Sequence, residues 1–287
     1  MAQGIFVGLS TIDIVYEVEE FPAANTKIAA KSQAVFVGGP ATNASIAFAL
    51  LGGRTALATA VGRHALSQMV RGELEKRAIQ LVDLSPEFED VPVISSAAID
   101  RAGNRNVVSA NAARVATPAA AVDSALLKQA GIVMVDGHYM QACRAWAKAA
   151  QASKIPVVLD GGSWKEGTKE LLGSVHTAIC SADFLPPGCE TKDEVIQYLR
   201  DAGAANVAIT DGGEPIQFSS GSSAGVLRVP QVDVVDTMGA GDVFHGAYCY
   251  FATSGHGFIE ALADAAEIAA ESCRYRGAQA WADARKG

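Results

Sequence analysis

Between residues 123 and 210, short apolar runs alternate regularly with longer amphipathic segments, and this pattern limits the fold class. The short runs predict strands and the longer segments predict helices. Such alternation implies parallel strands whose connecting helices cover both faces of one sheet. The predicted strands are 132–135, 157–159, 177–180 and 207–210, and the predicted helices are 123–129, 142–152, 165–172 and 192–201.

The two ends of the chain extend the same architecture. Residues 5–9 form an apolar run typical of a buried parallel strand, and residues 55–61 predict another strand. Residues 216–218 and 226–229 predict a late antiparallel pair. Further helices are expected at 44–51, 65–77, 258–275 and 278–285. The sequence therefore predicts an α/β fold with a mostly parallel central sheet.

Two stretches depart from this pattern, because polar and apolar residues alternate within them. We expect residues 14–37 and 91–110 to form a small β-sheet lid inserted into a single α/β domain spanning residues 1–287. A sheet this small cannot bury an apolar face alone, so it must cover a site, pack on a second copy of the chain, or do both. Candidates for that apolar face are Ile28, Val35, Val37, Val93 and Ile99.

Composition excludes several classes of partner. The net charge is −8 and no Lys/Arg-rich run exists, which argues against nucleic acid and anionic membranes. The five cysteines are scattered and odd in number, which indicates reduced thiols in a cytoplasmic protein. The first residues lack the basic region of a signal peptide, and no apolar run approaches the roughly 18 residues of a membrane span.

The stretch Asp-Thr-Met-Gly-Ala-Gly-Asp at residues 236–242 carries the strongest chemical signal. An apolar run at 232–235 predicts a strand before it, and the following residues suit a buried helix. Glycines where a strand turns into a helix let backbone N–H groups approach an anion. Asp242 fits such a site if it takes a proton from a hydroxyl that attacks a bound phosphoryl group. The alternative is a tight turn in which Asp242 favours the helix start.

Aspartates also follow several predicted strands. Three strands end in Asp-Gly, at Asp136, Asp160 and Asp211. Ligands of open α/β sheets bind beyond the carboxyl ends of the strands, so these residues, with Asp13 and Asp242, are expected along one rim. The alternative is ordinary turn chemistry. Only Asp13 and Asp242 are therefore assigned individual functions.

Residues 236–242 resemble the Asp-Thr-x-Gly-Ala-Gly-Asp signature of the ribokinase-like (PfkB) carbohydrate kinases. Asp13 after the first strand resembles the family's sugar-binding acid, and Gly38-Gly39 with Asn43 resembles its N-terminal motif. Residues 207–213 resemble the strand and glycine turn beneath the nucleotide. These stretches lie in order along nearly the whole chain.

The sequence also departs from the family. Arg63 and His64 stand where the family often has Asp and Gly, and residues 181–190 lack its Asn-x-x-Glu motif. Asp183 or Glu190 could replace that motif in placing Mg²⁺ and the phosphates. Because of this departure, a relative of the family that binds a sugar or nucleotide without catalysis is an alternative interpretation of the chain.

The resemblance implies an ATP-dependent transfer of the γ-phosphoryl group to a hydroxyl of a small sugar or sugar derivative. Asp242 would be the general base, and the N–H groups of Gly239, Ala240 and Gly241 would stabilise the transferring group. The implied sugar-binding residues are Asp13, Gly38, Gly39 and Asn43, with Arg105 as a further candidate. The implied nucleotide-binding residues are Thr210, Gly212, Gly213, Thr237, Gly239 and Gly241.

Cofactors and alternatives follow from the same resemblance. It implies Mg²⁺, a monovalent cation such as K⁺ near Asp236, and a homodimer joined through the lid. Asn43 could instead be a helix N-cap, and Arg105 a surface charge near a hairpin tip. A nucleoside kinase is a further alternative, but aromatic residues are only 7% of the chain, which favours a free sugar. We interpret His245 as a packing residue. The sequence does not identify the sugar.

Overall fold

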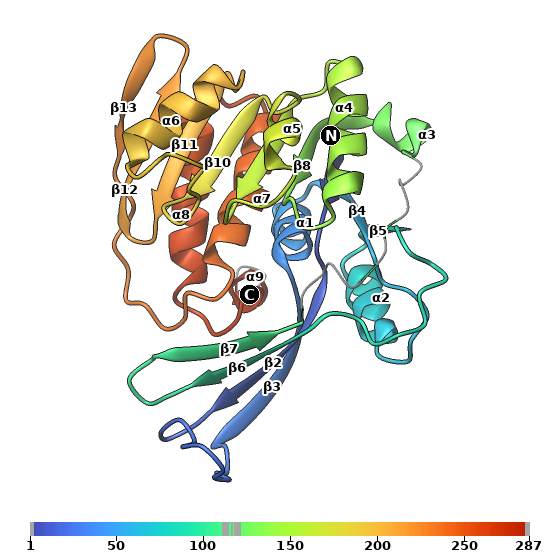
Figure 1. Ribbon diagram of the computed structural model, residues 1–287, viewed down its shortest axis with the longest axis vertical. Helices are drawn as coiled ribbons and strands as arrows, with labels where there is room; N and C mark the ends of the chain where they lie inside the picture. The colour runs from blue at the N-terminus through green and yellow to red at the C-terminus, as the bar shows by residue number, and fades with distance from the viewer. Residues whose placement is uncertain (1–2, 111–114, 116, 118–121, 285–287) are drawn as a thin grey trace.

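The computed structural model describes residues 3–110, 115, 117 and 122–284. It contains a nine-stranded sheet and a separate four-stranded sheet, and the smaller sheet projects below the main body in Figure 1. No helix in the described residues has the length and apolar character that crossing a membrane requires.

The large sheet has the strand order β13-β12-β11-β10-β9-β8-β1-β4-β5. All neighbouring strands pair in parallel except that β12 pairs antiparallel with both β11 and β13. The strands are β1 (Gln3–Val7), β4 (Arg54–Thr59), β5 (Gln80–Asp83), β8 (Ala130–Val135), β9 (Val157–Gly161), β10 (Thr177–Ser181), β11 (Asn206–Asp211), β12 (Glu214–Ser220) and β13 (Ser223–Leu227).

Helices cover both faces of this sheet. Successive residues of a strand point to opposite faces, so Ile5 and Val7 belong to one core and Phe6 to the other. The first core includes α3 (Ser124–Leu127), α4 (Met140–Ala152), α5 (Thr168–Leu172) and α6 (Lys192–Asp201). The second includes α1 (Pro40–Leu50), α2 (Ser67–Lys76), α7 (Ala240–Thr253), α8 (Phe258–Ser272) and α9 (Ala280–Ala284). This arrangement confirms the predicted fold class.

The small sheet, which we call the lid, has the order β3-β2-β6-β7. Its strands are β2 (Thr11–Glu17), β3 (Ser32–Gly38), β6 (Ile94–Ile99) and β7 (Arg105–Ser109). Both inserted segments contribute to it, as the alternating pattern predicted. The central pair β2 and β6 is parallel, and the outer pairs are antiparallel.

The predicted apolar face of the lid is wrong. Cross-strand partners share a face, and Ile99 is the partner of Glu17, whereas Val35 is the partner of Ile14. Because the side-chain period of a strand is two, Glu17 and Ile14 lie on opposite faces of the lid. Ile28 lies outside the strands. The strand register, which cannot be deduced from a single sequence, therefore places the predicted apolar residues of the lid strands on two different faces.

Three boundaries also differ from the predictions. Residues 232–235 form no strand, because the amide of Val235 donates to the carbonyl of Cys273 instead of to a sheet neighbour. The edge strand β5 was missed, since its four residues carry no alternating pattern. Helix α1 begins at Pro40, earlier than expected, because proline is favoured in the first helical turn. The last predicted helix ran to residue 285, which lies outside the described residues.

The contact between α1 and α7 is unusually close and generates a stability prediction. A Cβ atom on Gly246 would lie 2.2 Å from the carbonyl oxygen of Ala44. Gly246→Ala should therefore lower the free energy of unfolding by about 1–3 kcal/mol through overpacking, measured by urea denaturation.

The matched control is Gly72→Ala, because Gly72 is exposed on α2 and its Cβ would meet nothing within 4 Å. That variant should gain up to about 1 kcal/mol, since alanine is the better helix former. If both variants shift the urea midpoint in the same direction, close packing at Gly246 is not the cause.

Candidate active site

The N-terminus of α7 is formed by the glycines of the 236–242 stretch. Gly239 is the N-cap and has a left-handed φ of 71°. A Cβ there would lie 2.5 Å from the Cβ of Ala278, so only glycine fits. The amide of Ala240 closes a turn onto the carbonyl of Thr237 at 3.3 Å, while the amides of Gly239 and Gly241 have no acceptor among the residues that the structure describes. Free amides at a helix N-terminus are suited to an anion.

Asp242 stands in the first turn of the same helix and is half-buried. Its Oδ2 accepts a hydrogen bond of 2.8 Å from Nδ2 of Asn43. Burial, with the negative charge of Asp160 adding to it, raises the pKa of Asp242 to about 7, and the Asn43 hydrogen bond and His245 act against that rise. A carboxylate that titrates near neutral pH can accept a proton from a substrate hydroxyl.

Asn43 reaches Asp242 from the first turn of α1. The N-cap of α1 is Gly39, with φ 98°, and a Cβ there would lie 2.4 Å from the carbonyl oxygen of Leu9. The amide of Asn43 donates to the carbonyl of Gly39 at 2.9 Å, so Asn43 is inside the helix and the N-cap interpretation is wrong. Its side-chain Oδ1 is buried without a hydrogen-bond partner. The amide group therefore has a free acceptor beside Asp242.

Asp13 occupies the lid strand β2, not the carboxyl end of a strand of the large sheet as we expected. Thr11 Oγ1 donates to its Oδ1 at 2.8 Å. Burial raises the pKa of Asp13, and the Thr11 hydrogen bond opposes this effect. A Cβ on Gly38 would lie 2.0 Å from Asp13 Oδ2, so the glycine makes room for the carboxylate. Asp13 and Gly38 thus belong together, next to Gly39.

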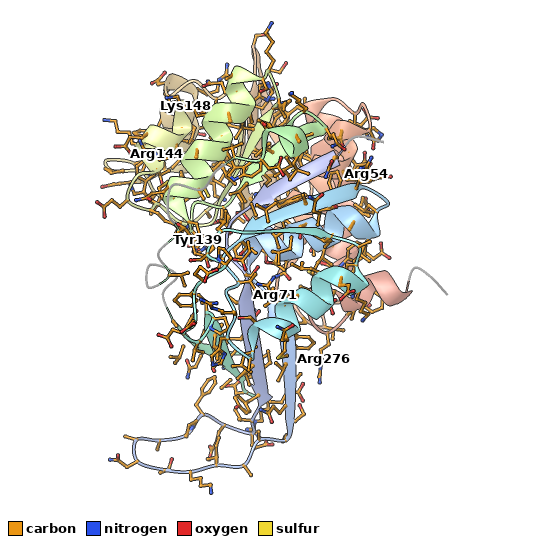
Figure 2. The ribbon with its side chains drawn as sticks, turned by 90° about the vertical axis from the view of Figure 1, so that its right-hand side faces the viewer. Arg54, Arg71, Tyr139, Arg144, Lys148 and Arg276 are labelled. Carbon is orange, nitrogen blue, oxygen red and sulfur yellow. The ribbon has the colours of Figure 1, made fainter. Side chains whose placement is uncertain are left out.

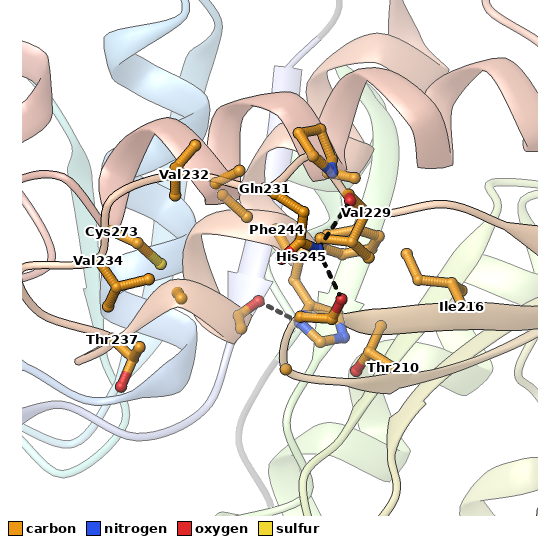
Figure 3. A pocket seen from close by; sticks show the side chains of 18 residues that line it. Thr210, Ile216, Val229, Gln231, Val232, Val234, Thr237, Phe244, His245 and Cys273 are labelled. Carbon is orange, nitrogen blue, oxygen red and sulfur yellow. Dashed lines mark hydrogen bonds between the residues drawn. The ribbon is translucent and has the colours of Figure 1, made fainter.

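A cavity of about 290 Å³ lies beside the N-terminus of α7 (Figure 3). It brings together the predicted nucleotide-binding residues Thr210, Gly212, Gly213, Thr237 and Gly241. Apolar residues that the sequence analysis did not identify also line it, and these are Ile216, Val229, Val232, Phe244 and Ala266. No motif marks these residues, because their shared position depends on the packing of α7 and α8 against the loop after β13.

A second cavity, of about 410 Å³, lies between the lid and the 234–238 loop. Its lining includes Phe36 and Arg105 from the lid. Nη2 of Arg105 donates to Thr237 Oγ1 at 3.1 Å, and Thr237 lines both cavities. Arg276, labelled in Figure 2, forms a salt bridge to Glu17 of β2. The lid is therefore tied to the body beside the glycine-rich stretch.

The other aspartates of the rim have structural partners. Asp136 is buried and accepts hydrogen bonds from the amides of Leu9 at 2.8 Å, Ala41 at 3.2 Å and His138 at 2.9 Å. Asp211 is exposed and forms a 2.7 Å salt bridge with Lys192. Asp136 therefore holds the ends of β1 and α1 together, and Asp211 is a surface residue.

The described residues include no cluster of three His, Cys, Asp or Glu side chains that could bind a metal ion directly. Neither Asp183 nor Glu190 lines one of the two cavities. Asp236 accepts from the amides of Met238 and Gly277, each at 2.9 Å. Its carboxylate thus joins the glycine-rich stretch to the turn after α8, where a monovalent cation had been expected.

Comparisons with known proteins identify the family and the fold of the chain. Residues 1–285 match the model of the pfkB family carbohydrate kinases. Ribokinase of Arabidopsis thaliana is 26% identical over 305 residues, covering 96% of this chain and 76% of the relative. The structure of A. thaliana ribokinase complexed with ribose and ATP has a TM-score of 0.82 at 22% identity, covering 98% of this chain and 95% of that one. Adenosine kinase from Sinorhizobium meliloti has a TM-score of 0.83 at 17% identity, covering 99% and 98%.

The buried hydrogen bonds of Asp136 generate a stability prediction. Asp136→Asn keeps the shape of the side chain but turns one acceptor oxygen into an amide that faces backbone donors. We expect a loss of about 2–4 kcal/mol in unfolding free energy, measured by urea denaturation. Asp211→Asn is the control and should cost no more than about 1 kcal/mol, because its ion pair is exposed. Equal losses for the two variants would contradict the structural assignment of Asp136.

Proposed function

The chain belongs to the pfkB family of carbohydrate kinases, and on that premise we propose that it transfers the γ-phosphoryl group of ATP to a hydroxyl of a small sugar or sugar derivative. Asp242 is the general base in this proposal. The observation that carries it is the 2.8 Å hydrogen bond from Asn43 to Asp242, because it joins the expected acceptor residues to the phosphoryl site.

In this proposal the acceptor is held by two side-chain oxygens, Asn43 Oδ1 and Asp13 Oδ2, that accept no hydrogen bond from the described residues. Asn43 Oδ1 is buried without a partner and can accept a hydrogen bond from a sugar hydroxyl, while Asp13 Oδ2 accepts from another. Gly38 and Gly39 let the backbone approach the sugar, since side chains there would collide with Asp13 and Leu9. A hydroxyl beside Asn43 also lies close to Asp242.

Asp242 and the N-terminus of α7 have different roles in the proposed phosphoryl transfer. The carboxylate takes the hydroxyl proton as the new O–P bond forms and the bond to ADP breaks. The amides of Gly239 and Gly241, with Ala240 beside them, stabilise the charge on the transferring group. Burial of the site strengthens both effects, because the surrounding dielectric is low.

The nucleotide occupies the 290 Å³ cavity in this proposal. Its apolar wall of Val229, Phe244 and Ala266 suits a base, and Thr210, Gly212 and Gly213 lie where polar contacts are needed. The described residues include no group of three His, Cys, Asp or Glu side chains that could hold Mg²⁺, which fits an ion held mainly by phosphates and water. When bound, Mg²⁺ neutralises charge on the phosphates. Asp236 fits as an anchor for the loop, and no proposed step requires a monovalent cation.

A nucleoside is the second candidate acceptor. The 410 Å³ cavity under the lid adds space, and Phe36, 36% exposed, lines it. Arg105 lines the same cavity and has no carboxylate within salt-bridge distance in the described residues, so an anionic sugar derivative would also be compatible.

An acceptor screen tests the proposed function. Release of ADP should be measured with Mg-ATP and ketoses, pentoses, sugar acids, sugar phosphates and adenosine. We expect the highest kcat/KM with a free or anionic sugar, because few aromatic side chains line the acceptor side. Adenosine as the best acceptor would favour the nucleoside kinase. Binding of ATP without turnover of any acceptor would favour a non-catalytic relative.

Asp242→Asn tests the base. We expect kcat to fall at least about a hundredfold, the usual worth of a positioned base. The raised pKa of Asp242, about 7, means that its carboxyl is neutral and cannot accept a proton at lower pH. Wild-type kcat/KM should therefore fall as pH drops below that value, and the variant should lack this limb.

The control for this prediction is Asp201→Asn, which changes an exposed carboxylate at the end of α6, outside both cavities. It should leave kcat and the pH profile unchanged. Near-normal turnover of a folded Asp242→Asn variant would remove Asp242 from its role.

The lid also supports a proposed homodimer. Its outer face carries Val35, 44% exposed, and Val108, 76% exposed, in one row with Ile14. Light scattering should report about twice the chain mass of 29.7 kDa, since a two-fold dimer would cover this row. Val108→Asp should yield a monomer. Val226→Asp, at a valine of β13 that is 63% exposed, is the control and should remain dimeric.

A further inference from the structure

A buried pair of titratable side chains, His245 and Asp160, lies directly behind the N-terminus of α7. His245 follows Asp242 by one helical turn and is 5% exposed. Asp160 lies on the adjoining strand β9 and is 7% exposed. The proposed reaction uses neither side chain. Figure 3 shows the imidazole at the wall of the nucleotide cavity, hydrogen-bonded to the residue that ends the glycine-rich turn.

The partners of the imidazole are all acceptors. Nδ1 of His245 lies 2.7 Å from the carbonyl oxygen of Gly241, and Nε2 lies 3.1 Å from the carbonyl oxygen of Ile179. Nε2 is also 3.6 Å from Oδ1 of Asp160. A neutral imidazole has one N–H and one lone pair, so in either tautomer a lone pair would face a carbonyl oxygen. Only a ring with hydrogen on both nitrogens satisfies both contacts.

Asp160 supplies the counter-charge for such a ring. Its Oδ2 is buried and has no hydrogen-bond partner, so the carboxylate is not stabilised by backbone amides as Asp136 is. A buried charge is tolerated only when it is paired. Burial raises the pKa of Asp160, and His245 is the strongest of the charges that oppose this rise.

We propose that His245, protonated on both ring nitrogens and paired with Asp160, is the positioning residue of the phosphoryl site. The ring ties the carbonyl of Gly241 to that of Ile179, and so fixes the first turn of α7 against β10. This contact fixes the peptide unit that joins Gly241 to Asp242, and so fixes the position of Asp242. The kinetic consequence rests on the proposed kinase function, whereas the protonation state does not.

Titratable groups on every neighbouring element face the pair. They are Asp242 and Cys249 on α7, Asp136 and His138 after β8, Lys165 after β9, and Cys180 on β10. The two thiols are neutral, because burial raises the pKa of each. The carboxylates in this set favour the protonated ring. Lys165 and His138 also oppose the rise in the pKa of Asp160, as His245 does. The ammonium group of Lys165, however, donates to the carbonyls of Asp136 and Ser163 and not to those that His245 contacts.

The protonation state can be measured without any activity. The full chain labelled with ¹⁵N-histidine should show both nitrogens of His245 with shifts of the protonated type at pH 7.5. Asp160→Asn should convert the ring to a neutral form. The resonances of His256, whose Nδ1 is 2.7 Å from Asp264 and whose side chain is 34% exposed, should not change in that variant. A neutral tautomer of His245 in the unaltered chain would overturn the proposal.

Kinetics test the positioning role. His245→Asn and Asp160→Asn should each lower kcat about tenfold or more, because a small displacement of reacting groups is costly. KM for ATP should change by less than about threefold, since the apolar wall of Val229, Phe244 and Ala266 is unchanged. The double variant should be no worse than either single variant, because the pair acts as one unit.

The matched control is His256→Asn, which removes a half-buried histidine beyond the end of the same helix and should leave kcat unchanged. Normal kcat in a folded His245→Asn variant, or losses that add in the double variant, would overturn the positioning role. If no acceptor is phosphorylated at all, the proposed function fails, but the NMR experiment still decides the state of His245. The same experiment decides it if the variants do not fold.

Discussion

The close contact of α1 with α7 is the constraint on which the rest of the site depends. It lets Asn43 reach Asp242 although the two residues are separated by 199 positions in the chain. The approach is possible because Gly246 presents no side chain to the carbonyl of Ala44. Both helices also begin at glycines with positive φ, Gly39 and Gly239, so their N-termini converge on one place. A larger side chain at residue 246 would push the two helices apart and would therefore separate the proposed base from the proposed acceptor groups.

A short segment after α8 connects this centre to the lid. Gly277 donates its amide to Asp236 in the glycine-rich stretch, and Gln279 donates its side-chain amide to the carbonyl of Val37 at 2.9 Å. Arg276, between them, is paired with Glu17 of the lid. A change in the conformation of the glycine-rich stretch on nucleotide binding would therefore be transmitted to β2 and β3, which carry Asp13 and Gly38. The segment gives the lid a mechanical link to the phosphoryl site.

Periodicity and the glycine-rich stretch were sufficient to predict the sheet, its two helical layers and the lid. The local sequence pattern gives a wrong prediction where contacts between residues distant in the chain determine the structure. The run 232–235 is apolar, but its last amide is taken by Cys273, and β5 is a short edge strand that carries no pattern. The faces of the lid follow from its register. The partner of Asn43 and the two carbonyls around His245 depend on how α1, α7 and β10 pack, so neither could be predicted from the sequence.

Three carboxylates, Asp136, Asp160 and Asp242, influence one another behind the helix N-terminus, and each is stabilised differently. Asp136 accepts hydrogen bonds from three backbone amides. Asp160 faces an imidazole. Asp242 has a single amide donor, Asn43, and a raised pKa of about 7. Burial raises the pKa of Asp160 as well, but of these two carboxylates only Asp242 lies in the first turn of α7, at the anion site. In the proposed reaction, the negative charges of Asp160 and Asp136 help to raise the pKa of the base.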